Sequence, residues 1–180
     1  MLPICHSIDV HKHAFTQAMG KTLLEVINGD LPVPTNFGNW QGSEFAPMPI
    51  NDLSRPISGH YGILHSINHV ANFSNVRLQC RNYYPPQGGM GWHTDSSNGN
   101  SFRVYVYYSL YDGNVFQYRD DIFEEHSGLG GYVFSIGQNC WHQVYAKWPR
   151  FVCGYEINES LANEIIDCSS YLQTEKERAS

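Results

Sequence analysis

The pattern of apolar and polar residues separates a helical and irregular first part of the chain from a β-rich second part. Apolar residues at helical spacing predict a helix over His13 to Asn28. From Leu31 to Gly59, five prolines stand among Asn, Gly and Ser without sustained periodicity, which is typical of a functional loop or lid. Gly62 to Phe73 has the pattern of a second short helix. The first 75 residues therefore predict helices and a long loop.

Period-two alternation and runs of β-branched and aromatic residues predict strands from Val76 onward. The strongest signal covers Phe102 to Leu110, whose continuous character indicates cover on both faces. Turn residues at 85–89 and 112–114 separate the segments. The predicted strands are Val76–Tyr84, Met90–Asp95, Phe102–Leu110, Val115–Arg119, Gly131–Ser135, Cys140–Val144 and Pro149–Ile157, followed by a helix over Ser160–Tyr171. We therefore expect a mainly β fold with flanking helices, of the double-stranded β-helix kind (a jelly roll, cupin-like).

Length and composition favour one folded domain. The 180 residues are 42% hydrophobic and 14% aromatic, which is typical of a globular chain. We expect a helix and loop over 1–75, a jelly-roll core over 76–157, and a helix and tail over 158–180. Five widely spaced cysteines without a C-x-x-C pair favour a reducing compartment. The sequence shows neither a signal peptide nor an apolar run near the roughly 20 residues of a membrane helix, so we expect a cytoplasmic protein.

The overall charge is acidic. A formal net charge of -6 and a pI near 5.8 leave no global basic field of the kind that attracts a nucleic-acid backbone. A local basic groove stays possible. Charge therefore favours a small-molecule or protein partner over a nucleic acid.

The most specific chemical pattern consists of His93, Asp95 and His142. Residues separated by one position in an extended segment point to the same face, so His93 and Asp95 form a pair that a distant His142 completes. Two imidazoles and one carboxylate leave half of an octahedron open, which suits Fe(II) enzymes that bind oxygen and a co-substrate. Arg150 follows on the next predicted strand, and its planar guanidinium suits a carboxylate. The alternative is that His93 and Asp95 pair only with each other.

Residues beside these candidates have expected orientations. Trp92 and Trp141 should face away from the metal and into the core, because neighbouring strand residues alternate. Arg103, Tyr105 and Tyr107 share one face of the central predicted strand, opposite two valines. We expect this polar set to line the interior, where it contacts co-substrate or substrate.

The segment from Asn82-Tyr83-Tyr84 to His93-Thr94-Asp95, with His142 and Arg150 downstream, resembles the Fe(II)/2-oxoglutarate-dependent dioxygenase superfamily. Its N-x-Y-x-P stretch is most similar to the AlkB-like branch, and the resemblance covers residues 76 to 157. It implies O2 as oxidant and two sets of binding residues: His93, Asp95 and His142 for iron, and Asn82, Tyr84 and Arg150 for 2-oxoglutarate.

The resemblance also bears on the substrate. AlkB-type dealkylases carry R-x5-R on the last strand, whereas this chain has Arg150 and then Glu156. The short interval from His142 to Arg150 is similar to the prolyl-hydroxylase branch. The resemblance thus implies hydroxylation of a small molecule or protein side chain, coupled to conversion of 2-oxoglutarate to succinate and CO2. The alternatives are an AlkB-like nucleic-acid dealkylase and a non-catalytic metal-binding jelly-roll module.

Overall fold

The computed structural model describes residues 3–28, 60–61, 64–65, 76–84, 86–96 and 101–179. The loop predicted from Leu31 to Gly59 lies outside the described residues. The fold is therefore reported for the remaining parts of the chain.

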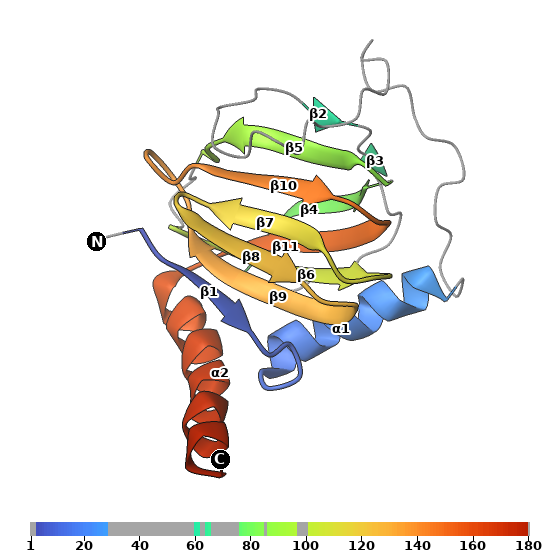
Figure 1. Ribbon diagram of the computed structural model, residues 1–180. Coiled ribbons are helices and arrows are strands. Elements are labelled where there is room, and N and C mark those ends of the chain that lie inside the picture. The colour runs from blue at the N-terminus through green and yellow to red at the C-terminus, as the bar shows by residue number, and fades with distance from the viewer. Residues whose placement is uncertain are drawn as a thin grey trace.

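The described residues form two helices and eleven strands (Figure 1). The helices are α1 (Ala14–Ile27) and α2 (Glu159–Ala179). The strands are β1 (Cys5–Ile8), β2 (His60–Tyr61), β3 (Leu64–His65), β4 (Arg77–Tyr84), β5 (Gly88–His93), β6 (Phe102–Ser109), β7 (Asn114–Tyr118), β8 (Asp121–Glu125), β9 (Gly128–Ser135), β10 (His142–Ala146) and β11 (Arg150–Ile157). No helix in these parts of the chain has the length and apolar character needed to cross a membrane.

The strands form two antiparallel sheets. One sheet has the order β1-β9-β6-β11-β4-β3 and the other has the order β2-β5-β10-β7-β8. Aromatic side chains join their inner faces: the Phe116 ring of β7 lies 4.8 Å from the Tyr132 ring of β9 and 6.1 Å from the Tyr105 ring of β6. Both helices contact the six-stranded sheet, and Figure 1 shows them beside its outer face. The prediction of a mainly β fold with flanking helices is confirmed.

Alternation along β6 separates two hydrophobic cores. Val104 and Val106 belong to the core under the helices, where they join Met19 and Leu23 of α1. The opposite face of β6 points between the sheets, and Tyr107 joins the second core there. The sequence expectation that the polar set of this strand lines the interior is confirmed, because period-two alternation requires the two sets to face opposite ways.

Several elements differ from the sequence prediction. The prediction of a second helix over Gly62–Phe73 is wrong at Leu64–His65, which form β3 and pair with Tyr83 and Asn82 of β4. The other residues of that range lie outside the described residues. Backbone pairing at the sheet edge overrides weak helical patterning there. The short strands β1, β2 and β8 were not predicted. β8 carries acidic residues that hide its strand character, although charged side chains are common on an edge strand.

The turn before the first metal-ligand candidate is shorter than predicted. Gln87 adopts a φ of 65°, and the chain re-enters a strand at Gly88, although both glycines after Gln87 were expected in the turn. β5 ends at His93, so Asp95 lies two residues beyond the strand. Strand alternation therefore does not explain how the Asp95 side chain comes to point the same way as that of His93. The closing helix also extends beyond the predicted end at Tyr171.

A close approach between strands makes Gly154 of β11 sensitive to substitution. A Cβ at this position would overlap the Tyr105 ring and lie 2.8 Å from Cys80 Sγ. We expect Gly154→Ala to lower the free energy of unfolding by roughly 1–3 kcal/mol, because overpacking forces neighbouring side chains out of place. Urea denaturation measures this loss, and an unchanged unfolding midpoint would contradict the packing described for this face.

Candidate metal centre

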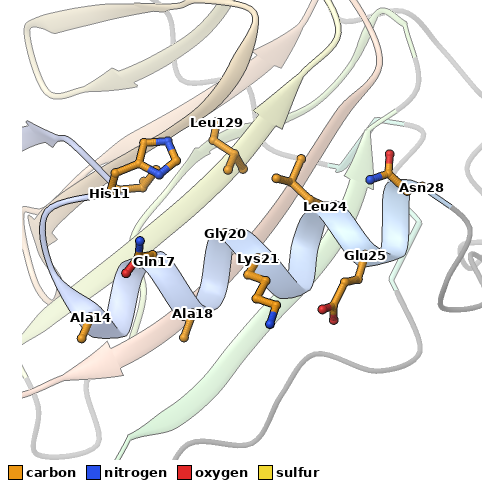
Figure 2. Close-up of a pocket in the computed structure, with 11 residues that line it drawn as sticks. His11, Ala14, Gln17, Ala18, Gly20, Lys21, Leu24, Glu25, Asn28 and Leu129 are labelled. Carbon is orange, nitrogen blue, oxygen red and sulfur yellow. The ribbon is translucent and has the colours of Figure 1, made fainter.

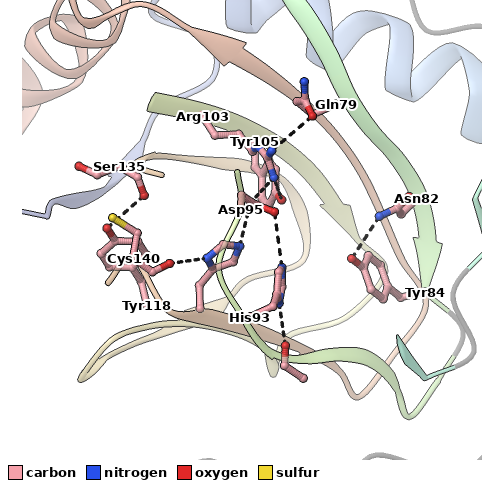
Figure 3. Close-up of polar contacts among 12 residues, drawn as sticks. Gln79, Asn82, Tyr84, His93, Asp95, Arg103, Tyr105, Tyr118, Ser135 and Cys140 are labelled. Atoms are coloured by element: carbon pink, nitrogen blue, oxygen red, sulfur yellow. Dashed lines mark hydrogen bonds and ion pairs between the residues drawn. The ribbon is translucent and has the colours of Figure 1, made fainter. Parts of the chain in front are cut away.

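Two neighbouring strands of the five-stranded sheet bring the candidate ligands together. His93 ends β5, His142 begins β10, and the two residues are directly paired in the antiparallel register. Their ring centroids lie 4.2 Å apart. Asp95 follows β5 and completes the group, so that one ligand atom from each residue lies within 4.8 Å of the others. Figure 3 shows His93 and Asp95 facing each other. The three residues predicted to bind a metal are thus assembled at one place.

Backbone carbonyls orient both imidazoles. His93 Nδ1 lies 2.7 Å from the Gly91 carbonyl oxygen, and His142 Nδ1 lies 2.9 Å from that of Cys140. A carbonyl oxygen only accepts hydrogen bonds, so we assign the ring proton to Nδ1 in both residues. Each Nε2 then carries a lone pair. Metal-binding histidines are commonly held in this way by a hydrogen bond from the other ring nitrogen.

The Nε2 atoms face Asp95. His142 Nε2 lies 3.2 Å from Asp95 Oδ2, and His93 Nε2 lies 3.9 Å from Asp95 Oδ1. These spacings are near the roughly 3 Å expected between adjacent ligands on one ion. His142 is 2% exposed, and its Nε2 has no hydrogen-bond partner in the described part of the chain. A buried ring nitrogen without a hydrogen bond fits a site for a metal ion.

Asp95 has the protonation state that a metal ligand needs. Burial raises the pKa of Asp95, but His142 and His93, when they are protonated, and the Arg103 guanidinium outweigh this effect and lower the pKa to about 2. The carboxyl group is therefore ionised at neutral pH. Together with the two imidazoles, it offers the nitrogen and oxygen ligand set that suits Fe(II).

Arg103 of β6 supports the Asp95 carboxylate from the facing sheet. Its Nη1 donates to Asp95 Oδ2 and also to the Tyr105 hydroxyl at 3.2 Å, and its Nη2 donates to Gln79 Oε1 at 3.5 Å. The sequence predicted that Arg103 faces the interior but did not predict this ion pair. The partners that hold the guanidinium also fix the orientation of Asp95.

Asn82 and Tyr84 lie on β4 and are buried in the structure. Asn82 Nδ2 lies 3.4 Å from the Tyr84 hydroxyl, to which it donates, while Asn82 Oδ1 has no hydrogen-bond partner among described residues. Burial raises the pKa of Tyr84 to about 12, although the nearby Arg150 opposes the shift. The Tyr84 phenol therefore keeps its proton at neutral pH and can donate a hydrogen bond to an oxygen of a bound molecule.

Arg150 contacts a carboxylate that belongs to the chain itself. Arg150 Nε lies 2.7 Å from Glu125 Oε2, and Nη2 lies 2.7 Å from Glu125 Oε1. Both side chains are fully buried, and Ser109 donates to Glu125 at 3.1 Å. The guanidinium also lies over the Tyr84 and Tyr107 rings, at 5.3 and 5.5 Å from their centroids. Sequence analysis missed Glu125 because it missed β8.

Trp141 does not lie in the core as expected. Its side chain is 47% exposed. It immediately precedes the inward-facing His142, so strand alternation turns it to the outer face of the five-stranded sheet, whereas both helices contact the other sheet. Its carbonyl oxygen accepts a hydrogen bond from Arg119 N at 2.8 Å. Trp92 is half-buried. The prediction of a core position is thus wrong for Trp141.

A pocket of about 580 Å³ lies elsewhere, along α1 (Figure 2). Its lining includes Val10, Leu24 and Leu129 and none of the candidate ligands. The candidate metal centre therefore rests on the convergence of its ligand atoms. Comparison of the chain with family models, curated proteins and solved structures found no match.

Proposed function

We propose that this chain is an Fe(II)- and 2-oxoglutarate-dependent dioxygenase that hydroxylates a C–H bond of a small molecule or a protein side chain. The observation that carries the proposal is the convergence of two Nε2 lone pairs and one ionised carboxylate from His93, His142 and Asp95. Three ligands of this kind leave coordination positions open for a co-substrate and oxygen.

We further propose that the two sheets form a double-stranded β-helix. The support is the face-to-face arrangement of two antiparallel sheets, with both histidine ligands on paired strands of one sheet. Ligands held on regular strands keep a fixed geometry, which is what an open metal site requires.

In the proposed mechanism the chain binds and orients iron, 2-oxoglutarate and the substrate, and it excludes water from the site. Iron and 2-oxoglutarate, when bound, supply the oxidising chemistry, in which O2 converts 2-oxoglutarate to succinate and CO2 and a substrate C–H bond is hydroxylated. Arg103 holds Asp95 in the orientation needed for coordination. Asn82 and the protonated Tyr84 offer hydrogen bonds to co-substrate oxygens. The aromatic core between the sheets keeps the interior dry.

The proposed role of Arg150 is to bind the far carboxylate of 2-oxoglutarate. Glu125 accepts hydrogen bonds from Nε and Nη2 of Arg150. An incoming carboxylate must therefore bind through Nη1 or displace Glu125. In either case Glu125 opposes binding, because two carboxylates near one guanidinium repel each other.

We therefore expect Glu125→Gln to lower the apparent KM for 2-oxoglutarate by about 10-fold, since it removes a competing charge with little change of shape. Ser109→Ala is the matched control, because it removes a hydrogen bond to Glu125 and keeps the charge. Initial rates of succinate formation at varied 2-oxoglutarate measure the change. If Glu125→Gln leaves KM unchanged, Arg150 does not bind the far carboxylate.

The function itself is tested by product formation. Protein incubated with Fe(II), 2-oxoglutarate and O2 should form succinate slowly even without its substrate and faster in the presence of a substrate from a screened set. Methylated oligonucleotides belong in this set, because formaldehyde release from them would favour the nucleic-acid dealkylase. Tight Fe(II) binding without any succinate would favour a non-catalytic metal-binding module.

A further inference from the structure

Glu156 is a buried carboxylate with one oxygen atom that has no hydrogen-bond partner among the described residues. Its side chain is 1% exposed, and its Oε1 has no hydrogen-bond partner in the part of the chain that the structure describes. None of the ion pairs between described residues involves Glu156. Buried glutamates are almost always paired, because removing a charge from water is costly. The partner of Glu156 is therefore expected to come from outside the described chain.

Strand register places Glu156 beside the residue that supports the metal centre. β11 pairs with β6 so that Glu156 lies opposite Arg103. Directly opposed residues of an antiparallel pair have neighbouring side chains on one face. The face is the interior one, because Tyr155 and Ile157, the residues on either side of Glu156, belong to the core under the helices. Glu156 is thus the neighbour of Arg103, which donates a hydrogen bond to Asp95.

Neither neighbouring arginine forms an ion pair with Glu156 among the described residues. The terminal nitrogens of Arg103 donate hydrogen bonds to Asp95, Tyr105 and Gln79, as Figure 3 shows. Arg77, its partner in β4, is exposed and makes no ion pair with Glu156 in the described structure.

Two hydrogen-bond donors in the same cluster also lack partners. These are Arg103 Nε and Gln79 Nε2, which have no hydrogen bond among the described residues. The carboxylate suits a donor group of a bound ligand and the two donors suit an acceptor group of it, so the cluster has the mixed polar character of a site that recognises a polar ligand.

We propose that Glu156 binds a cationic group of the substrate, an alkylammonium or guanidinium, and so holds the substrate beside the metal centre. The role in placing a C–H bond rests on the proposed function, whereas the cation site depends only on Glu156. The formal net charge of -6 favours the approach of a cation. Free basic amino acids and the lysine or arginine side chains of proteins share this chemistry.

Calorimetric titration tests the proposal with L-lysine, L-arginine and a short peptide that contains both residues. The wild type should bind at least one of them about 10-fold or more tightly than its side-chain-neutral counterpart, citrulline or the Nε-acetylated form, because a charged hydrogen bond is lost. Binding of the free amino acids identifies a small-molecule substrate, and binding of the peptide alone identifies a protein side chain.

Two variants isolate the role of Glu156. Glu156→Gln should weaken binding of the cationic probe about 10-fold or more, whereas Glu124→Gln removes an exposed carboxylate of β8 and should leave binding unchanged. Without a probe, Glu156→Gln should raise the thermal midpoint by about 2–4 °C, because it removes a buried carboxylate whose Oε1 has no hydrogen-bond partner among the described residues. If Glu156→Gln does not fold, the cation site is tested by the wild type alone: equal binding of the charged and the neutral probes would overturn it.

The outcomes separate this inference from the proposed function. Fe(II) binding and succinate formation without any preference for a cationic probe would overturn the cation site and leave the dioxygenase proposal intact. Cation binding that depends on Glu156, in a protein that forms no succinate, would support the site and contradict the dioxygenase.

Discussion

His93→Ala is expected to weaken Fe(II) binding at least about 100-fold and to reduce succinate formation to background. Loss of a residue that only supports a ligand already costs about 10–100-fold in metal affinity, and this change removes a ligand. The His93 side chain is 27% exposed, so its truncation should disturb the core less than truncation of the buried His142. Metal content after dialysis and the rate of succinate formation measure the two effects.

The exposed His126 provides the matched control for this change. Its side chain is 81% exposed and lies beside Asp112, on a different turn from the candidate ligands. His126→Ala should bind Fe(II) as the wild type does. If His93→Ala also keeps its metal and its turnover, the assignment of the ligand set is wrong.

Glu125→Ala is expected to lower the free energy of unfolding by roughly 3–5 kcal/mol. The change leaves the buried Arg150 guanidinium without its carboxylate, and breaking one half of a buried ion pair has a cost of this size. Glu124→Ala, at the exposed neighbouring position of β8, should change the stability by no more than about 0.5 kcal/mol. Urea denaturation of both variants measures the difference.

A double variant separates the lost partner from lost packing. Arg150→Met combined with Glu125→Leu removes both charges and keeps side-chain volume, so it should recover most of the stability that Glu125→Ala loses. Stability of the double variant no higher than that of Glu125→Ala would mean that packing, rather than an unpaired charge, explains the loss.

The sequence pattern identifies the central elements because their alternation reflects burial directly. Phe102 to Ser109 has apolar residues toward the helices and polar aromatic residues toward the interior, and this segment forms β6 nearly as predicted. Helix α1 also follows its predicted range closely. In both elements one physical requirement, cover of one face, fixes the spacing of the residues.

Other elements depend on contacts that spacing does not encode. Asp95 joins the two histidines from beyond the end of β5, where Arg103 of the other sheet holds it, so its position does not follow from the strand alternation on which the prediction was based. The pairing of Glu125 with Arg150 joins two strands that are distant in sequence. β3 forms because an edge of β4 is available for pairing. Tertiary contacts of this kind are absent from any local pattern.

The central claim is that three residues hold an iron ion that also binds 2-oxoglutarate. The most direct measurement is an anaerobic titration of the metal-free protein with Fe(II) and then with 2-oxoglutarate, followed by visible absorption. We expect a metal-to-ligand charge-transfer band that appears only after both additions in the wild type and is absent in His93→Ala. No band and no tight Fe(II) binding in the folded wild type would contradict the claim.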